Sequence, residues 1–187
     1  MPKVVNRVVH IPKANEKNQL IDEIIKIRQI INNVADRNDP NIVMDLASMP
    51  ETPVISIHPY ESMEEHEHLL GKLYENKDFL TQADKVFSHL VRPITFWMQE
   101  IIEPIEGITV DDKPQFLLTN VWKAARGKRW ELVDMLREGR AKKEGVKPAL
   151  SVNITGDFDL VFMRLPLRSL SEFTFFLKDV PNISKMG

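Results

Sequence analysis

The chain has 187 residues, of which 43% are hydrophobic and 28% charged, and its formal net charge is -2, a composition typical of a globular protein that buries a core. It contains no cysteine, which excludes disulfides, thiolate catalysis and cysteine-based zinc sites and agrees with a reducing compartment. The first residues lack the apolar core of a signal peptide and no apolar stretch approaches the ~20 residues of a membrane span, so we expect a cytoplasmic protein.

The first half of the chain alternates strand-like and helix-like segments. Residues 4–9 are short and rich in β-branched side chains, which predicts a buried strand. A helix with one buried face is predicted next, from apolar residues at helical spacing: Leu20, Ile24, Ile27, Ile31 and Val34. Alternating patterns then predict strands at residues 41–47 and 54–58.

Two helical segments and a strand complete this half. A helix is predicted to begin at Ser62, because acidic residues follow in the first turn, where the helix dipole favours them. A break near Asn76 separates its apolar stripe from a second stripe, and Pro93 ends that second segment because proline lacks the amide hydrogen. Residues 94–102 predict a fourth strand, so the order within residues 1–103 is βαββαβ.

The second half begins after a connector. Residues 104–114 contain prolines, a glycine and acids, and we expect them to link a first domain, 1–103, to a second, 115–187. The second domain should repeat the same elements. They are a strand at 115–122, a helix at 129–143, a strand around 150–154, a turn at Gly156, a strand at 160–165 and a helix capped by Ser169.

The two halves also resemble one another residue by residue. Two pairs of segments align in the same order: residues 8–24 with 120–136, and residues 55–70 with 162–177. The second alignment matches Pro59 with Pro166 and Ser62 with Ser169. Internal repetition of this kind predicts one supersecondary plan used twice. After Asp179 too few residues remain for a full fourth strand, so we expect a clipped second copy.

A βαββαβ unit is the ferredoxin-like arrangement, an antiparallel sheet with helices on one face. We therefore predict an α+β fold of two tandem ferredoxin-like repeats whose antiparallel sheets pack face to face as an intramolecular α+β barrel. This order, with the stretch VISIHPYESMEEH at residues 54–66, resembles the dimeric α+β barrel superfamily. That superfamily includes stress-responsive barrel proteins, NIPSNAP-like proteins and small monooxygenases of the antibiotic-biosynthesis type, some of them haem-degrading.

The resemblance implies candidate catalytic residues. Haem-degrading members use an asparagine on the first strand, a tryptophan on the third strand and a histidine on the second helix as the iron ligand. The resemblance thus implies such roles for Asn6, for Tyr60 at the tryptophan position and for His89. The alternative for His89 is a helix-flank histidine with a satisfied hydrogen bond. We expect no cofactor, with haem as the alternative.

Two pairs of residues have the side chains of metal ligands, but their spacing argues against a metal site. Glu64 and His68 share a helix face, but two ligands rarely suffice for a metal ion. His10 and His58 each end a strand, which should place them at opposite ends of the sheet, on the order of 20 Å apart. We therefore expect no metal site.

A basic stretch beside two tryptophans suggests a binding site for an anion or a nucleic acid, because cations pair with phosphates and aromatic rings stack on bases. It comprises Lys123, Arg126, Lys128 and Arg129, next to Trp122 and Trp130. Acidic residues are interleaved in the helix that follows, so we favour a solvated surface and expect no nucleic-acid partner.

The remaining candidate is one face of the predicted sheets. The repeat alignment superposes Val4, Asn6, Val8 and His10 on Phe116, Leu118, Asn120 and Trp122. Apolar walls with isolated polar groups are typical of a small-molecule pocket, and also of a sandwich core whose amides are hydrogen-bonded. We name four candidate ligand-binding residues facing the space between the sheets: Asn6, His10, Asn120 and Trp122.

Three functions remain open from the sequence. The first is an α+β barrel protein that binds a small, mainly apolar ligand between its two sheets and forms a homodimer. The second is a small monooxygenase, cofactor-poor or haem-linked, that uses Asn6, Tyr60 and His89. The third is a structural interaction module without a ligand.

Overall fold

The computed structural model describes residues 3–37, 42–45, 53–108, 114–169 and 171–172, and only the backbone of 42–45. The chain divides into two compact units, Met1–Glu100 with Ile154–Gly156, and Ile101–Asn153 with Asp157–Gly187. None of the described helices combines the length and the apolar character needed to cross a membrane. Each unit is α+β, as predicted.

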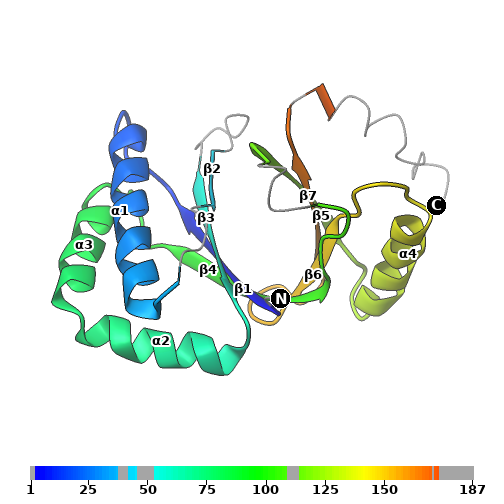
Figure 1. Cartoon of the computed structure of the whole chain (residues 1–187), viewed down its shortest axis with the longest axis horizontal. Coiled ribbons are helices and arrows are strands. Elements are labelled where there is room, and N and C mark those ends of the chain that lie inside the picture. The colour runs from blue at the N-terminus through cyan, green and yellow to red at the C-terminus, as the bar shows by residue number, and fades with distance from the viewer. Residues whose placement is uncertain (1–2, 38–41, 46–52, 109–113, 170, 173–187) are drawn as a thin grey trace. The chain divides into compact units, whose positions relative to one another are not determined.

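The first unit has the predicted βαββαβ order, with its second helix divided in two. Its elements are β1 (Val4–His10), α1 (Lys17–Ala35), β2 (Ile42–Asp45), β3 (Val54–Tyr60), α2 (Met63–Glu75), α3 (Lys77–Ser88) and β4 (Thr95–Glu103), whose last three residues belong to the second unit. The strands are antiparallel in the ferredoxin-like order β2-β3-β1-β4. All three helices lie on one face of this sheet (Figure 1), which agrees with the prediction.

The predicted helix boundaries have identifiable caps. The Ser62 hydroxyl accepts a hydrogen bond from the Glu65 amide at 3.1 Å, which satisfies an otherwise free donor at the start of α2. Asn76 ends α2 and begins α3, and its side-chain oxygen accepts from the Phe79 amide at 2.9 Å. The predicted break near Asn76 is therefore confirmed, and it arises because Asn76 is the N-cap of a new helix.

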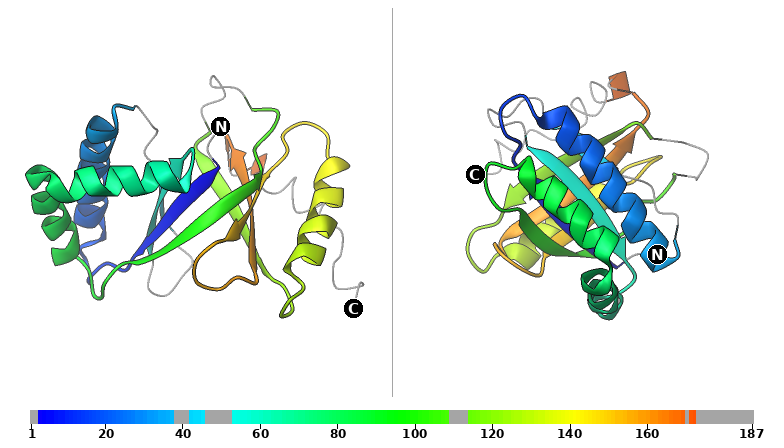
Figure 2. Two further views of the ribbon diagram at one scale, coloured as in Figure 1. Left: turned by 90° about the horizontal axis from the view of Figure 1, so that it is seen from below. Right: turned by 90° about the vertical axis from the view of Figure 1, so that its left-hand side faces the viewer.

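Apolar side chains from the helices and from one face of the sheet form two clusters in this unit. One cluster contains Val4, Ile31, Tyr60, Leu69, Leu73 and Met98. The other contains Leu20, Ile24, Val54, Val86 and Leu90. The even-numbered residues of β1 and β3 therefore face the helices, because successive strand residues point to opposite faces. The right-hand view of Figure 2 shows the helices in front of this sheet.

The second unit repeats the first four elements. They are β5 (Phe116–Lys123), α4 (Arg129–Ala141), β6 (Ala149–Asn153) and β7 (Leu160–Leu167). β7 pairs antiparallel with both β5 and β6. Val133 of α4 packs on Val152 and Val161, so α4 covers one face of these strands. The predicted last helix is described only at residues 171–172, and the rest of it lies outside the described residues.

Strand register confirms the tandem repeat. Val4 lies opposite Tyr60 in the first unit, and Phe116 lies opposite Leu167 in the second. The first repeat alignment equates Val4 with Phe116, and the second equates Tyr60 with Leu167. Residues matched by two separate alignments therefore form equivalent cross-strand pairs in both units. The predicted linker, 104–114, falls within the second unit, and its residues 109–113 lie outside the described residues. The predicted domain limits stay a prediction.

Candidate functional site

The four predicted ligand-binding residues lie on helix-covered faces. Asn6 and His10 share their face of β1 with Val4, which packs against α1 and α2. Asn120 and Trp122 share their face of β5, and Trp122 lies opposite Val161, which packs against α4. The prediction that these side chains face away from the helices is therefore wrong. Strand periodicity identifies residues that share a face, but not the face that a helix will cover.

Beneath α1, buried polar side chains form a continuous chain of contacts. His10 Nε2 lies 3.1 Å from the Ser56 hydroxyl, which lies 3.0 Å from His58 Nε2. The other ring nitrogen of His58, Nδ1, contacts Arg28 Nη1. All four side chains are buried, and Arg28 is only 2% exposed. We call His10, Ser56, His58 and Arg28 the polar chain.

The polar chain corrects the expected separation of the two histidines. Antiparallel pairing places Asn6 opposite His58 and His10 opposite Val54, so the histidines are offset along neighbouring strands. Both rings nevertheless reach the hydroxyl of Ser56, which lies between them on the same face. The predicted separation of about 20 Å is wrong, because it counted strand length and ignored convergence of long side chains on one short one.

Donor and acceptor rules assign the tautomers within the polar chain. A guanidinium can only donate, so His58 Nδ1 accepts from Arg28 and His58 Nε2 carries the proton. That Nε2–H donates to the Ser56 oxygen, and the Ser56 hydroxyl donates to His10 Nε2. His10 then carries its proton on Nδ1, which has no hydrogen-bond partner in the described part of the chain.

Burial keeps both histidines neutral. It lowers the pKa of His10 to about 4. It also lowers the pKa of His58 well below its usual value, with a further contribution from the positive charge of Arg28. A neutral imidazole can both donate and accept, which the assigned direction of the polar chain requires.

Asn6 and Tyr60 lie beside the polar chain. Asn6 is directly opposite His58, and its buried side-chain oxygen has no hydrogen-bond partner among the described residues. The Tyr60 ring lies 4.5 Å from the His66 ring, and the Arg37 guanidinium lies 5.1 Å above it. Burial lowers the pKa of His66 as well. Polar groups thus extend along β3 from Ser56 to Tyr60, under the helices.

His89 lies elsewhere. It is the C-cap of α3, and its Nδ1 lies 2.9 Å from a carboxylate oxygen of Glu16. The next residue, Leu90, bridges to Pro12 beyond the end of β1, whereas Tyr60 pairs with Val4 at its start. His89 and Tyr60 are therefore on the order of 20 Å apart. The structure brings Asn6 and Tyr60 together but not His89, and these three residues do not fit around one haem iron.

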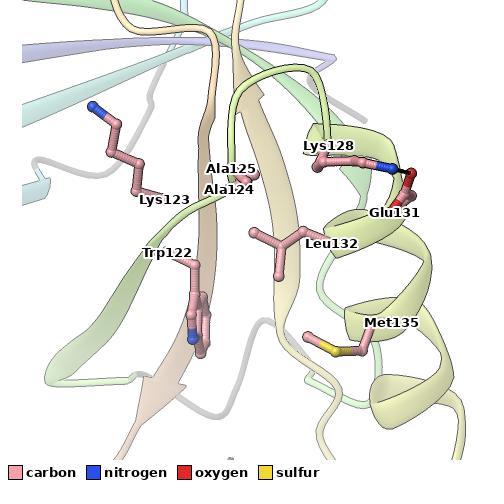
Figure 3. Close-up of a pocket in the computed structure, with 8 residues that line it drawn as sticks. All are labelled: Trp122, Lys123, Ala124, Ala125, Lys128, Glu131, Leu132 and Met135. Carbon is pink, nitrogen blue, oxygen red and sulfur yellow. Dashed lines mark hydrogen bonds and ion pairs between the residues drawn. The ribbon is translucent and has the colours of Figure 1, made fainter. Parts of the chain in front are cut away.

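The second unit contains an open groove of about 340 Å³ between the end of β5 and α4 (Figure 3). It is lined by Trp122, Lys123, Ala124, Ala125, Lys128, Glu131, Leu132 and Met135. Leu132 and Met135 project from α4 toward the strand that carries Trp122, and Lys123 points away from the indole. The apolar lining thus comes from both secondary-structure elements, and one predicted ligand-binding residue, Trp122, belongs to it.

In the basic stretch, Lys123, Lys128 and Arg129 already have partners within the chain. Lys128 pairs with Glu131 at 2.5 Å, and Lys123 pairs with Asp157 at 2.8 Å. The Arg129 guanidinium lies 4.8 Å above Trp130 and donates to two backbone carbonyls. In the described ranges, no three or more histidine or acidic side chains are placed to hold a metal ion.

Sequence reasoning missed Arg28, Ser56, Leu132 and Met135. Arg28 had a detectable signal, because it occupies the apolar stripe of α1 four residues after Ile24. A charged residue on a buried stripe needs polar partners, which here include His58. Leu132 and Met135 are one helical turn apart on α4, a spacing that would place them on one face. Ser56 had no signal beyond its position in a strand.

No model of a protein family matches the sequence, and no curated protein matches it. Solved structures do match. A candidate monooxygenase from Fusobacterium nucleatum shares 9% identity at a TM-score of 0.69, covering 99% of this chain and 87% of its own. The chain has the dimeric α+β barrel fold. A candidate monooxygenase from Lactobacillus acidophilus matches this fold at a TM-score of 0.63 and 8% identity. The match covers 95% of this chain and 82% of the Lactobacillus chain.

A third solved structure that matches is an anthrone oxidase-like protein. It shares 11% identity with this chain at a TM-score of 0.59 and covers 97% of it and 79% of its own length. At identities this low the similarity establishes the α+β barrel fold alone, and the chemistry of this chain must come from its own side chains.

Proposed function

We propose that this α+β barrel protein binds a small, mainly apolar ligand in the groove between β5 and α4. The groove itself is the observation that carries the proposal, since its volume of about 340 Å³ lies within the range of ligand pockets. Its lining includes one large aromatic ring, Trp122, and the adaptable side chain of Met135. Thioether and indole groups both favour contact with a flat apolar molecule.

The test uses the uncharged fluorescent probe N-phenyl-1-naphthylamine. We expect saturable binding to the native protein, with energy transfer from a nearby tryptophan. Met135→Glu should weaken it about tenfold or more, because a carboxylate in the groove must be desolvated. Met135 is 43% exposed, so its replacement should leave the fold intact.

Met63→Glu is the matched control, since Met63 is 45% exposed and lies on a helix of the other unit. It should bind the probe as the native protein does. Trp122→Ala should weaken binding like Met135→Glu. Native-like binding in both groove variants, or no binding by the native protein, would refute the proposed groove.

We propose a small monooxygenase as the second candidate function. The buried Asn6 oxygen beside His58 and Tyr60 favours it, since this oxygen has no hydrogen-bond partner among the described residues. An apolar layer with a few buried polar groups can orient an oxidisable ligand. Two structural neighbours are candidate monooxygenases and one is anthrone oxidase-like, which supports testing anthrone as a substrate.

Oxygen uptake with anthrone is the measurement. Uptake by the native protein that falls in Asn6→Ala and Tyr60→Phe would support the oxygenase, and absence of uptake would oppose the cofactor-free form. The haem-linked alternative is not proposed, because His89 pairs with Glu16 at the other end of the sheet from Tyr60.

A further inference from the structure

We propose that Arg7 and Trp97 form a binding site for the carboxylate of a small organic acid, on the sheet face of the first unit that its helices do not cover. This site is separate from the groove beside α4 and rests on different residues. Val4 packs against the helices, and Arg7, three residues further along β1, points to the opposite face because successive strand residues alternate between faces. Trp97 of β4 is its direct cross-strand neighbour.

The Arg7 guanidinium has a cation–π contact and no acceptor among the described residues. Its carbon lies 4.9 Å from the centre of the Trp97 ring. In the part of the chain that the structure describes, no hydrogen bond or ion pair of Arg7 is present. A cation–π contact contributes about 0.5–2 kcal/mol and satisfies none of the five N–H donors of a guanidinium.

The apolar surroundings of Arg7 make its charge energetically costly. Val5, on the same strand and face, is buried, and so is Ile57, directly opposite Arg7 on β3. Burial lowers the pKa of Arg7 to about 10, because desolvation disfavours the charged form. An oxyanion on the guanidinium would offset that cost, because charge-assisted hydrogen bonds strengthen where water is excluded.

A second arginine in the chain shows what a satisfied guanidinium looks like. The side chain of Arg140 is 8% exposed, and it donates to the Pro148 and Pro104 carbonyls at 2.9 and 2.7 Å. It also pairs with Glu106 at 2.9 Å. Arg7 has no counterpart to any of these acceptors among the described residues, so its donors are available to a ligand.

The Trp97 ring is held in place, which favours a preformed site. Gly156 lies against it, with a φ of +79°, and a Cβ at Gly156 would be 2.7 Å from Trp97 Cδ1. The same short segment is hydrogen-bonded to Met98, whose amide donates to Thr155 Oγ1 at 2.9 Å and whose carbonyl accepts from the Ile154 amide at 2.8 Å. Little ordering cost remains when a ligand binds to such a fixed ring.

The expected ligand follows from these two groups. A carboxylate is planar and matches the guanidinium fork with two parallel hydrogen bonds. The face and edge of the indole provide apolar contact for the rest of the molecule. Thr95, two residues before Trp97 on the same face of β4, is exposed, so that end of the site is open to solvent.

The test compares benzoate with its uncharged analogue benzamide at constant ionic strength. Proton–nitrogen NMR follows the Arg7 Nε–H and the Trp97 indole N–H in the full chain. We expect benzoate to shift both signals saturably and benzamide to bind at least about tenfold more weakly. The Arg129 and Trp130 pair is an internal control, because its guanidinium already donates to the Asn153 and Phe158 carbonyls.

Substitutions complete the test. Arg7→Met should abolish the benzoate response, and Arg7→Lys should weaken it, because an ammonium lacks the planar fork. Arg129→Met should leave it unchanged. Equal binding of benzoate and benzamide, equal shifts at Arg129, or retained binding in a folded Arg7→Met variant would overturn the proposal. Should Arg7→Met fail to fold, the comparison of the two probes on the native protein decides it alone. None of these outcomes depends on the groove.

Discussion

His10 and His58, on neighbouring strands, are joined through the hydroxyl of Ser56, which lies 3.1 Å from one imidazole and 3.0 Å from the other. Because Arg28 can only donate to His58, the direction of every hydrogen bond in this polar chain is determined. Both imidazoles must stay neutral for the hydrogen bonds of the polar chain to persist, so these hydrogen bonds depend on pH.

Stability should fall as the pH drops from about 6.5 toward 4. Burial lowers the pKa of His10 to about 4, while an unfolded imidazole keeps its usual value. The unfolded state therefore binds protons in this window that the folded state does not, and acid favours unfolding. His10 alone accounts for a loss on the order of 3 kcal/mol by about pH 4. Urea unfolding at several pH values measures it.

Two variants isolate this effect from the titration of carboxylates. His10→Gln should show a shallower dependence of unfolding free energy on pH than the native protein. His68→Gln, at an exposed position of the same unit, should show the native dependence. A native dependence in both variants would contradict the role assigned to His10.

Ser56→Ala should destabilise the first unit by about 1–3 kcal/mol, because it leaves the Nε2 atoms of two buried imidazoles without a partner. Ser88→Ala is the control. Its exposed hydroxyl donates to the Lys85 carbonyl at 2.7 Å, and its loss should cost less than about 0.5 kcal/mol. Denaturant unfolding compares the two variants. Nitrogen NMR of the native protein should show His58 protonated on Nε2 and His10 on Nδ1, and the reverse assignment would contradict the polar chain.

Gly156→Ala should cost more stability than Gly127→Ala. The φ angles of Gly156 and Gly127 are +79° and +78°, so the backbone strain of an alanine should cost a similar amount, about 1–2 kcal/mol, at each position. A Cβ at Gly127 meets nothing within 4 Å, whereas one at Gly156 overlaps the Trp97 ring. Thermal or urea unfolding should therefore separate the two variants. Equal losses would mean that the Trp97 ring moves freely, which would also remove the rigidity argued for the Arg7 site.

Arg140→Met should destabilise the second unit by about 2–4 kcal/mol, because it leaves two carbonyls and the Glu106 carboxylate without their buried donor. Arg137→Met is the matched change one turn earlier on α4. Arg137 is 41% exposed and pairs with Glu103 at 2.7 Å, so its loss should cost less than about 1 kcal/mol. Urea unfolding measures both, and similar losses would show that burial of Arg140 contributes little.

Much of the fold was predictable because its signals are local. Strand bounds inferred from periodicity agree with the structure to within about two residues at each end, whereas α3 ends at Ser88, before the Pro93 that was predicted to end it. Ser62 and Asn76 mark helix starts through side-chain caps that need only a few neighbouring residues. The repeat was also visible, since aligned segments keep the same order and later proved to share strand register.

The candidate sites were predictable only in part. Asn6, Tyr60 and Trp122 were named from a resemblance or a pattern, and each lies beside buried polar groups or a groove. The partners that give them chemical meaning come from elements distant in sequence. Arg28 on α1 reaches His58 on β3, and Met135 on α4 completes the wall opposite Trp122.

The amino-acid sequence by itself determined the order of elements, their caps and the parity that groups Asn6 with His10 or Arg7 with Val9. Only the tertiary structure decided which of those faces the helices cover, and hence that His10 joins His58 while Arg7 stacks on Trp97. The physical reason is that parity and capping depend on residues a few positions apart. The partner of a buried side chain depends on which distant element packs over it and excludes water.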